Sequence, residues 1–431
     1  MKFISTNGRT DPTDLSTALL AGLAPDGGLY FPEEIESSPV GRFDACTTLP
    51  QVARVFLKPF FDGDSTLGDL RAICDQSLDI ETPLVPLAPN SHLLELFHGP
   101  TAAFKDYGAR FLANALGRLH AGEDAAPLTI LVATSGDTGS AVAAAFHRRP
   151  GFRVVILYPD GRVSKRQAHQ LGCFGDNILA LRVPDGFDRC QALAKQAFSD
   201  SELRARVPLS SANSISLGRL LPQATYYAFA SLLHHRATGS TLSFIVPTGN
   251  LGNAVAALIA KRAGLPIRRV LFATNGNRTV PEFIESGAYR ARPSIGTPAN
   301  AMDVGDPSNV ARLRFMMAKD PALLPALAAL SADDETIRAR IRSGEADYGK
   351  LFCPHTACGI EMLEHERRLG SRDDFCVVAT AHPSKFEDVV EPLVGHAVEP
   401  PPALRAMLAR PAASEVLAPD YESLKDRLLR L

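Results

Sequence analysis

A repeated unit of strand, small-residue loop and helix constrains the fold of this chain more than any other sequence feature. The apolar run Leu128–Ala133 is followed by the polar loop Thr134–Ser140 and an alanine-rich segment, residues 141–148, that is predicted to be helical. Leu242–Pro247 leads in the same way through the loop Thr248–Asn253 into another predicted helix. Further strands are predicted at residues 153–158, 270–273 and 376–380. Apolar strands that alternate with helices predict an α/β fold, with parallel sheets covered by helices on both faces.

The two ends of the chain lack this alternation of strands and helices. Residues 1–90 contain helical pieces and turns such as Pro25–Gly28, and they are predicted to form a separate N-terminal cap. The tail that follows Pro400–Pro402 is predicted to be helical and to wrap the core. A chain of 431 residues has room for two or three domains.

Composition and charge exclude several classes of partner. The formal net charge is −2, so no overall field attracts nucleic acid or acidic lipid, and any anion site must be local. The start of the chain has no apolar signal segment, and no apolar run reaches the roughly 18 residues that suggest a membrane span. We therefore expect a cytoplasmic protein that does not bind a membrane.

Cysteine usage agrees with that compartment. The seven cysteines contain no CxxC pair, which favours reduced thiols. Cys353, His355 and Cys358 offer three ligands on one short turn, whereas structural zinc takes four. No metal site is predicted.

Both loops of the repeated unit have the residues of an anion site. Glycines allow backbone amides to turn inward, and a helix N-terminus favours negative charge. Thr248–Asn253 is thus a candidate phosphate loop, and Thr134–Ser140 is a candidate for a carboxylate or a phosphate. The residues alone do not decide which loop takes which group, and each loop can also be a plain strand-to-helix turn. Neither a Walker loop nor a GxGxxG motif is present, which argues against a dinucleotide enzyme.

Lys105 and Arg219 are candidate functional cations. Ala102–Phe104 would draw Lys105 toward the interior, where a desolvated amine can act as a nucleophile and form a Schiff base. Arg219 follows Asn213 and Ser214, and its planar guanidinium suits a phosphate monoester. For either residue, an exposed surface position is the alternative.

The order of these motifs resembles the threonine synthase family. Lys105 lies in Phe-His-Gly-Pro-Thr-x-x-Phe-Lys-Asp, which resembles the cofactor-lysine motif of that family. Other matching segments are Gly22–Pro32, Thr134–Gly139, Asn213–Ser214, Pro247–Gly252, Asn300–Asp303 and Thr380–Pro383. The resemblance covers nearly the whole chain and is strongest to the longer bacterial and fungal branch. It differs at Thr248, Leu251 and Asn253, where relatives often have serine, phenylalanine and aspartate.

The resemblance implies a tryptophan-synthase-β-like, fold type II enzyme with pyridoxal 5'-phosphate as cofactor and O-phospho-L-homoserine as substrate. It implies a Schiff base at Lys105 and a pyridine-nitrogen contact at Thr380. The cofactor phosphate would be held by Gly249, Asn250, Leu251, Gly252 and Asn253. The substrate carboxylate and the cofactor ring would lie near Ser135, Gly136, Asp137 and Thr138, and the substrate phosphate near Asn213, Ser214 and Arg219.

Three domains are expected on the same basis. They are the cap at residues 1–90, a smaller α/β domain at 91–215 with the cofactor lysine, and a larger α/β domain at 216–431 with the phosphate loop. The alternatives are a serine/threonine dehydratase-like enzyme of the same fold and a non-catalytic relative that binds phosphate ligands. The sequence does not predict the oligomeric state.

Overall fold

The computed structural model describes residues 1–120 and 126–431, and within that part of the chain the strands form three sheets. The five-stranded sheet has the order β13-β7-β6-β5-β8, and all of its neighbouring strands are parallel. Its strands are β5 (Leu128–Ala133), β6 (Phe152–Pro159), β7 (Ile178–Val183), β8 (Leu209–Ser211) and β13 (Glu415–Val416).

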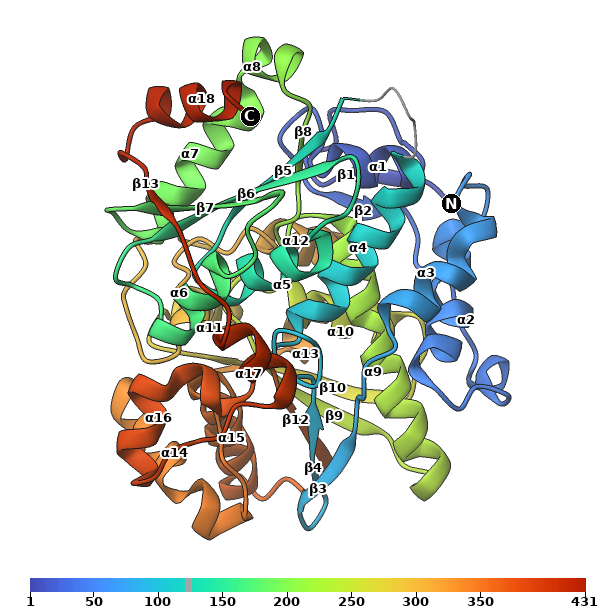
Figure 1. Ribbon diagram of the computed structural model, residues 1–431. Coiled ribbons are helices and arrows are strands. Elements are labelled where there is room, and N and C mark those ends of the chain that lie inside the picture. Colours follow the sequence, from blue (N-terminus) through green and yellow to red (C-terminus); the bar gives the residue numbers. More distant parts are fainter. Residues whose placement is uncertain (121–125) are drawn as a thin grey trace.

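The six-stranded sheet has the order β11-β10-β9-β12-β4-β3. Its strands are β3 (Leu84–Ala88), β4 (Ser91–Glu95), β9 (Leu242–Pro247), β10 (Ile267–Thr274), β11 (Ala328–Ser331) and β12 (Asp374–Ala379). Only the edge pair β3–β4 is antiparallel within this sheet. A small antiparallel pair, β1 (Phe3–Ser5) and β2 (Tyr30–Pro32), lies apart from both (Figure 1).

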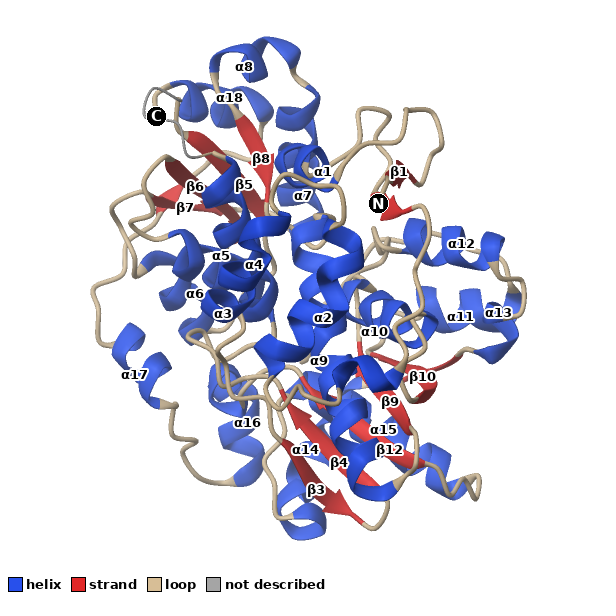
Figure 2. Ribbon diagram, turned by 90° about the vertical axis from the view of Figure 1, so that its right-hand side faces the viewer, coloured by secondary structure: helices blue, strands red, loops and turns tan. Residues whose placement is uncertain are grey.

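Helices surround both large sheets (Figure 2). They are α1 (Leu15–Ala21), α2 (Leu49–Phe61), α3 (Leu70–Ser77), α4 (Lys105–Leu119), α5 (Asp137–Phe146), α6 (Lys165–Gly172), α7 (Phe187–Ser199), α8 (Ser201–Arg206), α9 (Leu217–Thr238), α10 (Gly252–Arg262), α11 (Thr279–Ser286), α12 (Val310–Lys319), α13 (Leu323–Ala326), α14 (Asp334–Tyr348), α15 (Pro354–Arg368), α16 (Glu387–Val394), α17 (Pro402–Leu408) and α18 (Tyr421–Leu429). Short 3₁₀ turns are η1 (Val40–Phe43), η2 (Leu67–Asp69), η3 (Asn300–Met302) and η4 (Pro383–Phe386).

The predicted α/β architecture is confirmed. Strands β5 and β9 have the predicted bounds, and every residue of both is buried. Such strands are apolar throughout because helices cover both faces of the sheet. The long helix α9 is mostly buried and packs against α2, α4 and α10, so it joins the N-terminal helices to the core.

Sheet membership does not follow the predicted boundary at residues 90/91, whereas the one predicted at 215/216 falls between β8 and β9, which belong to different sheets. Strands β3 and β4 lie on either side of the first boundary, yet they pair with each other. Strand β4 also pairs with β12, so a segment near residue 90 belongs to the same sheet as residues 374–379. Sequence order could not indicate this, because the pairing is between strands almost 300 residues apart.

The tail returns across the molecule, as predicted. In Figure 1 it runs from α16 through α17 and β13 to α18, beside the five-stranded sheet. Strand β13 pairs with β7, and Leu424 and Leu428 of α18 belong to the hydrophobic cluster that includes Leu181 of β7 and Leu193 of α7. The last residues of the chain thus complete a core that begins near residue 131.

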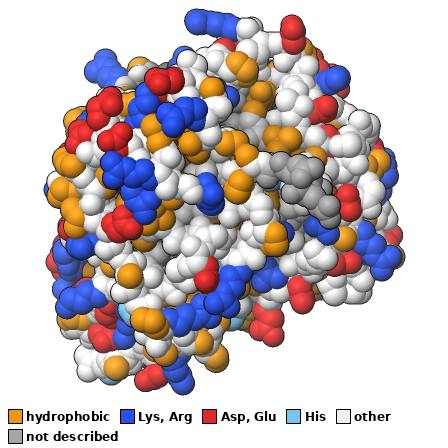
Figure 3. Space-filling model, turned by 45° about the horizontal axis from the view of Figure 1, so that its top comes forward, with side chains coloured by type: hydrophobic (Ala, Val, Ile, Leu, Met, Phe, Trp, Pro, Cys, Tyr) orange, Lys and Arg blue, Asp and Glu red, His pale blue; other side chains and the backbone are white. Residues whose placement is uncertain are grey.

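The surface carries charges of both signs, and the cysteines are buried. Basic and acidic side chains are interspersed on the face shown in Figure 3. All seven cysteines are free and buried. In residues 1–120 and 126–431, no helix is long and apolar enough to cross a membrane, and no cluster of ligands for a metal ion occurs.

Candidate active site

The ends of strands from both large sheets meet at one cavity. The loop after β5 comes from the five-stranded sheet, while the loop after β9 and Thr380 after β12 come from the six-stranded sheet. The first turns of α4 and α9 complete the lining with Lys105 and Arg219. Loops at the carboxyl ends of parallel strands are where α/β proteins bind ligands.

Lys105 is the first residue of α4, and the backbone before it is fixed by the six-stranded sheet. The Phe104 amide donates to the Thr380 carbonyl (2.8 Å), and Ala103 forms a bridge with Ala381. The Lys105 amine lies 4.6 Å from the centre of the Phe104 ring. Burial, together with the positive charges of Arg219 and Lys385 and against the effect of Asp137, lowers the pKa of Lys105 to about 8. The amine is therefore neutral far more often than that of an exposed lysine.

The loop between β5 and α5 is held in shape by hydrogen bonds to the side chain of Thr134. The Thr134 hydroxyl accepts hydrogen bonds from the amides of Gly136 and Gly139, each at 3.0 Å. Gly136 has φ 136°, and a Cβ there would lie 2.7 Å from Gln167 Nε2, so only glycine fits. Ser135 and Thr138 line the cavity, where their hydroxyls can meet a ligand.

Asp137 is the only acidic side chain among the described residues that line this cavity. Its Oδ2 lies 3.9 Å from Lys105 Nζ, and it is 2% exposed. Burial by itself raises the pKa of Asp137, but Lys385 and Lys105 outweigh it and hold that pKa well below its usual range. The carboxyl group is therefore ionised inside the protein.

The loop between β9 and α10 presents a helix N-terminus to the cavity. Leu251 has a left-handed backbone (φ 61°) that turns the chain into Gly252 and Asn253 at the start of α10. Tyr227 donates to Asn253 Oδ1 (2.8 Å), and Tyr226 donates to the same atom. Two hydroxyl donors on one oxygen orient the side-chain amide of Asn253 so that its Nδ2 is left for a ligand.

The polar segment at residues 213–219 lies directly against the loop between β9 and α10. Asn250 donates to Ser214 Oγ (2.6 Å), and its Oδ1 accepts from the Ser308 amide (2.6 Å). Arg219 is 1% exposed, and its Nη1 donates to the Ala212 carbonyl (2.6 Å). Burial lowers the pKa of Arg219 only to about 10, so it stays positively charged near neutral pH.

Arg312 of α12 connects the site with the N-terminal segment. It is fully buried, and its guanidinium donates to the carbonyls of Tyr30 (2.9 Å) and Ile215 (2.5 Å) and to Asn309 Oδ1 (2.7 Å). Asn309 in turn donates to the Asn250 carbonyl (3.0 Å). One arginine thus fixes strand β2 and two cavity loops to one another.

The structure brings the predicted site residues together. Gly136 faces Gln167 and does not line the cavity, whereas all the other predicted site residues do: Lys105, Ser135, Asp137, Thr138, Asn213, Ser214, Arg219, Gly249, Asn250, Leu251, Gly252, Asn253 and Thr380. Prediction by motif missed Ser308 and His355, which also line it, and Arg312 and Lys385, which support it. Lys385 has a local signal, because it follows the quoted Thr380–Pro383 segment at a strand end. Arg312 and His355 have none, since only tertiary contacts bring them here.

The sequence matches known proteins along nearly its whole length. A family model described as pyridoxal-phosphate dependent enzyme matches residues 77–381, and models of the threonine synthase N terminus and C-terminal region match residues 2–78 and 356–427. Threonine synthase of Escherichia coli (strain K12) is 36% identical over 100% of this chain and 99% of its own. The chain belongs to the threonine synthase family of pyridoxal-phosphate-dependent enzymes.

Solved threonine synthases share its fold. The crystal structure from Escherichia coli matches with a TM-score of 0.92 and 34% identity over 100% of both chains. The pyridoxal-phosphate-bound structure from Brucella melitensis matches with a TM-score of 0.90 and 34% identity over 100% of this chain and 99% of its own. The predicted family and fold are thereby confirmed.

The cavity lining fits the cofactor of the threonine synthase family. Among the described residues, Asn213 Oδ1, Arg219 Nε and Asn253 Nδ2 are buried polar atoms without a hydrogen-bond partner, and all three belong to cavity residues. Buried polar atoms are usually satisfied, so these indicate polar ligands. A Cβ at Gly249 would lie 2.6 Å from Met302 Cα, so this loop packs directly on the backbone of η3 and has no room for a side chain at that position.

Proposed function

We propose that this chain converts O-phospho-L-homoserine and water into L-threonine and phosphate, with pyridoxal phosphate bound at Lys105. The observation that carries the proposal is the position of one partly buried amine, that of Lys105, between two loops that each lead into a helix. A small substrate with a carboxylate and a phosphate, together with a phosphorylated cofactor, needs separate anion sites around one reactive amine. We expect this work to take place in the cytoplasm.

We assign the cofactor to the six-stranded side of the cavity. Gly249, Asn250, Leu251, Gly252 and Asn253 would hold its phosphate at the N-terminus of α10, where amides and helix dipole favour an anion. Thr380 would meet the pyridine nitrogen from the end of β12. When bound, pyridoxal phosphate supplies an electron sink for charge that develops at the substrate carbons.

We assign the substrate to the loops after β5 and β8 and to the first turn of α9. Ser135, Gly136, Asp137 and Thr138 would surround its carboxylate and the cofactor ring, and Asn213, Ser214 and Arg219 would receive its phosphate. The Asn250–Ser214 hydrogen bond supports neighbouring sites for the two phosphates, since it joins their loops. Lys105 can accept and return protons at the substrate carbons, because its burial keeps a large neutral fraction.

The test is the reaction itself. The purified protein is given O-phospho-L-homoserine, and the phosphate and threonine released are measured together. In separate reactions it is given serine or threonine alone. Equal release of phosphate and threonine supports the proposal. Formation of a keto acid from serine or threonine without phosphate turnover would favour a dehydratase, and binding without turnover would favour a non-catalytic relative.

Arg219 tests the placement of the substrate phosphate. Loss of a charge-assisted hydrogen bond costs roughly 1.5–3 kcal/mol, so Arg219→Ala should weaken productive substrate binding about ten- to a hundredfold and leave the cofactor bound. Arg118→Ala is the matched control, because Arg118 pairs with Asp69 outside the cavity. A variant that loses cofactor but keeps substrate affinity would mean that the two phosphates are assigned in the wrong order.

A further inference from the structure

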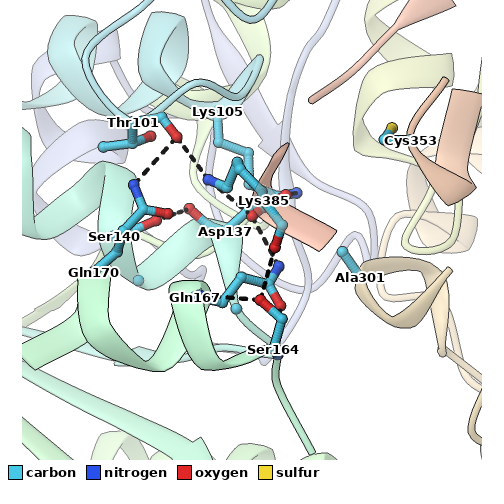
Figure 4. Close-up of polar contacts among 12 residues, drawn as sticks. Thr101, Lys105, Asp137, Ser140, Ser164, Gln167, Gln170, Ala301, Cys353 and Lys385 are labelled. Carbon is cyan, nitrogen blue, oxygen red and sulfur yellow. Dashed lines mark hydrogen bonds and ion pairs between the residues drawn. The ribbon is translucent and has the colours of Figure 1, made fainter. Parts of the chain in front are cut away.

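A fully buried lysine lies near Lys105. Lys385 belongs to η4, the short turn that follows Thr380, and its side chain is 0% exposed. Its amine lies 3.0 Å from Asp137 Oδ1 and donates to the Thr101 carbonyl (2.6 Å), as Figure 4 shows. Ionised groups are rarely buried so completely, and the pair therefore calls for an explanation.

The two oxygens of Asp137 have different neighbours. Oδ1 accepts from Lys385 and from Gln167 Nε2 (3.0 Å), whereas Oδ2 faces Lys105 at 3.9 Å. Of the two lysines, only Lys385 is within hydrogen-bond distance of the Asp137 carboxylate. The Asp137 carboxylate is therefore held through Oδ1, by Lys385 and Gln167, and not through the oxygen that faces Lys105 (Figure 4).

Lys385 is not needed to hold its own segment in place. The Lys385 carbonyl already accepts from Ser164 Oγ (2.7 Å), and Arg166 donates to the Ser384 carbonyl (2.6 Å) and to Glu391 (3.2 Å). These contacts fix η4 and α16 on α6 without the ammonium group. Among the described acidic residues, Asp137 is the one that forms an ion pair with Lys385, while the charge of Lys385 also favours the ionised form of the buried Asp106.

The pairing of Lys385 with Asp137 affects the protonation of Lys105. If Lys385 were absent, the buried Asp137 carboxylate would have Lys105 as its nearest cation and would stabilise it as ammonium. An ammonium ion has no lone pair, so it can neither form a Schiff base nor accept a proton. The charged and titratable groups that face Lys105 come from five places: Asp137 of α5, Arg219 of α9, Lys385 of η4, Cys353 before α15 and His355 of α15.

We infer that Lys385 is a positioning residue that serves as the fixed counter-ion of Asp137, holding its carboxylate off Lys105 so that the Lys105 amine stays available. The role of Lys105 as the reacting amine rests on the proposed function. The Lys385–Asp137 pair itself rests only on geometry.

The test compares Lys385→Met, Asp137→Asn, the double variant and Lys385→Arg with the wild-type holoenzyme. The absorbance of bound pyridoxal phosphate is titrated with pH, because it reports protonation at the Lys105 nitrogen. Lys385→Met should move the midpoint upward by about one pH unit, a tenfold change, and Asp137→Asn should move it downward. The double variant should return close to wild type, and Lys385→Arg should keep the wild-type midpoint. Lys261→Met is the control, because Lys261 bonds backbone carbonyls outside the site.

Two results would overturn the inference. One is an unchanged midpoint in Lys385→Met, and the other is an upward shift that persists undiminished in the double variant. If Lys385→Met does not fold, the double variant must titrate above Asp137→Asn, and equal midpoints would refute the pairing. Failure of the proposed function gives a different pattern, in which the midpoints follow the expected order but wild type forms no threonine. If no cofactor binds, trace acetylation of Lys105 by acetic anhydride in the same variants gives the midpoints instead.

Discussion

At the scale of single residues, this site is governed by how completely its charges are buried. Asp137 lies 3.0 Å from Lys385 and 3.9 Å from Lys105, and Arg219 lines the same cavity as Lys105 and Asp137. Low solvent access strengthens each interaction and makes an unpaired charge costly. Substitutions that remove one charge should therefore act on its neighbours as well as on themselves.

Lys105 should be the residue that carries the cofactor. Borohydride reduction of the wild-type holoenzyme, followed by digestion, should give a pyridoxyl group on the Lys105 peptide. Lys105→Ala should give no tagged peptide, because no other lysine among the described residues lines the cavity. A tag on Lys385 or on any other lysine of the wild type would contradict the assignment.

His355 should make the protein sensitive to acid. Burial lowers the pKa of His355 to about 4, so the folded protein keeps it neutral while the unfolded chain takes up a proton below pH 6.5. Stability is therefore complete above pH 6.5 and is lost as the pH falls toward 4. Between pH 7.5 and 5 the loss from this group is roughly 2 kcal/mol.

The measurement is the apparent urea midpoint at both pH values. His355→Gln keeps an acceptor for the Ala301 amide, which now donates to His355 Nε2 (3.1 Å). Its stability should fall by about 2 kcal/mol less than that of wild type over this interval. Equal losses in both proteins would mean that His355 is not held neutral.

At the scale of elements, the site depends on how closely its loops approach one another. The loop between β9 and α10 contacts η3, the segment after β8 contacts Asn250, and Arg312 joins both to β2. No single loop makes the cavity. Each is positioned by backbone contacts with elements that are distant in sequence.

Gly249 should be intolerant of a side chain. A Cβ there would lie 2.6 Å from Met302 Cα and 2.7 Å from its carbonyl oxygen, and backbone atoms cannot move aside as a flexible side chain can. Gly249→Ala should weaken cofactor binding at least about tenfold, the cost of losing one charge-assisted hydrogen bond. The measurement is an absorbance titration of the cofactor-free protein with pyridoxal phosphate.

Gly68→Ala is the matched control, because nothing lies within 4 Å of a Cβ at that position. It should bind the cofactor as wild type does. Unchanged affinity in Gly249→Ala would show that the loop has room to shift without loss of its phosphate contacts.

At the scale of the whole molecule, the two ends of the chain complete cores formed by its middle. The N-terminal helices share one hydrophobic cluster with α4 and α9, and the rings of Phe61 and Phe111 meet edge-on at 6.3 Å. The C-terminal tail closes the hydrophobic cluster on the five-stranded sheet. The cap and the tail are thus parts of the folded unit and not appendages.

Leu424 should stabilise the protein although it lies far along the tail. It is fully buried against the cluster of β7 and α7. Leu424→Ala should lower stability by about 2–5 kcal/mol, the range for a leucine truncated in a core. Val416→Ala in the same tail is the control, because Val416 is 62% exposed. Urea denaturation of both variants checks this, and equal midpoints would mean that the tail is not docked.

The sequence by itself determined the local parts of this protein. Strands β5 and β9, the loops after them and the start of α4 are set by apolar runs, glycines and helix-forming residues that act over a few neighbours. The order of the motifs was enough to predict the family and a group of residues that line the cavity, although not Ser308 or His355. These features are readable because their physical causes lie within short stretches of chain.

Only the tertiary structure decided which distant groups meet. It placed β4 beside β12, so that residues near 90 belong to a sheet that the sequence assigns to a later domain. It also brought Lys385 to Asp137 and Arg312 to Tyr30, contacts between residues separated by more than 200 positions. A charged side chain shows no pattern in sequence that distinguishes a buried partner from solvent. Its partner is determined by the packing of sheets and helices, and so is the electrostatic character of the site.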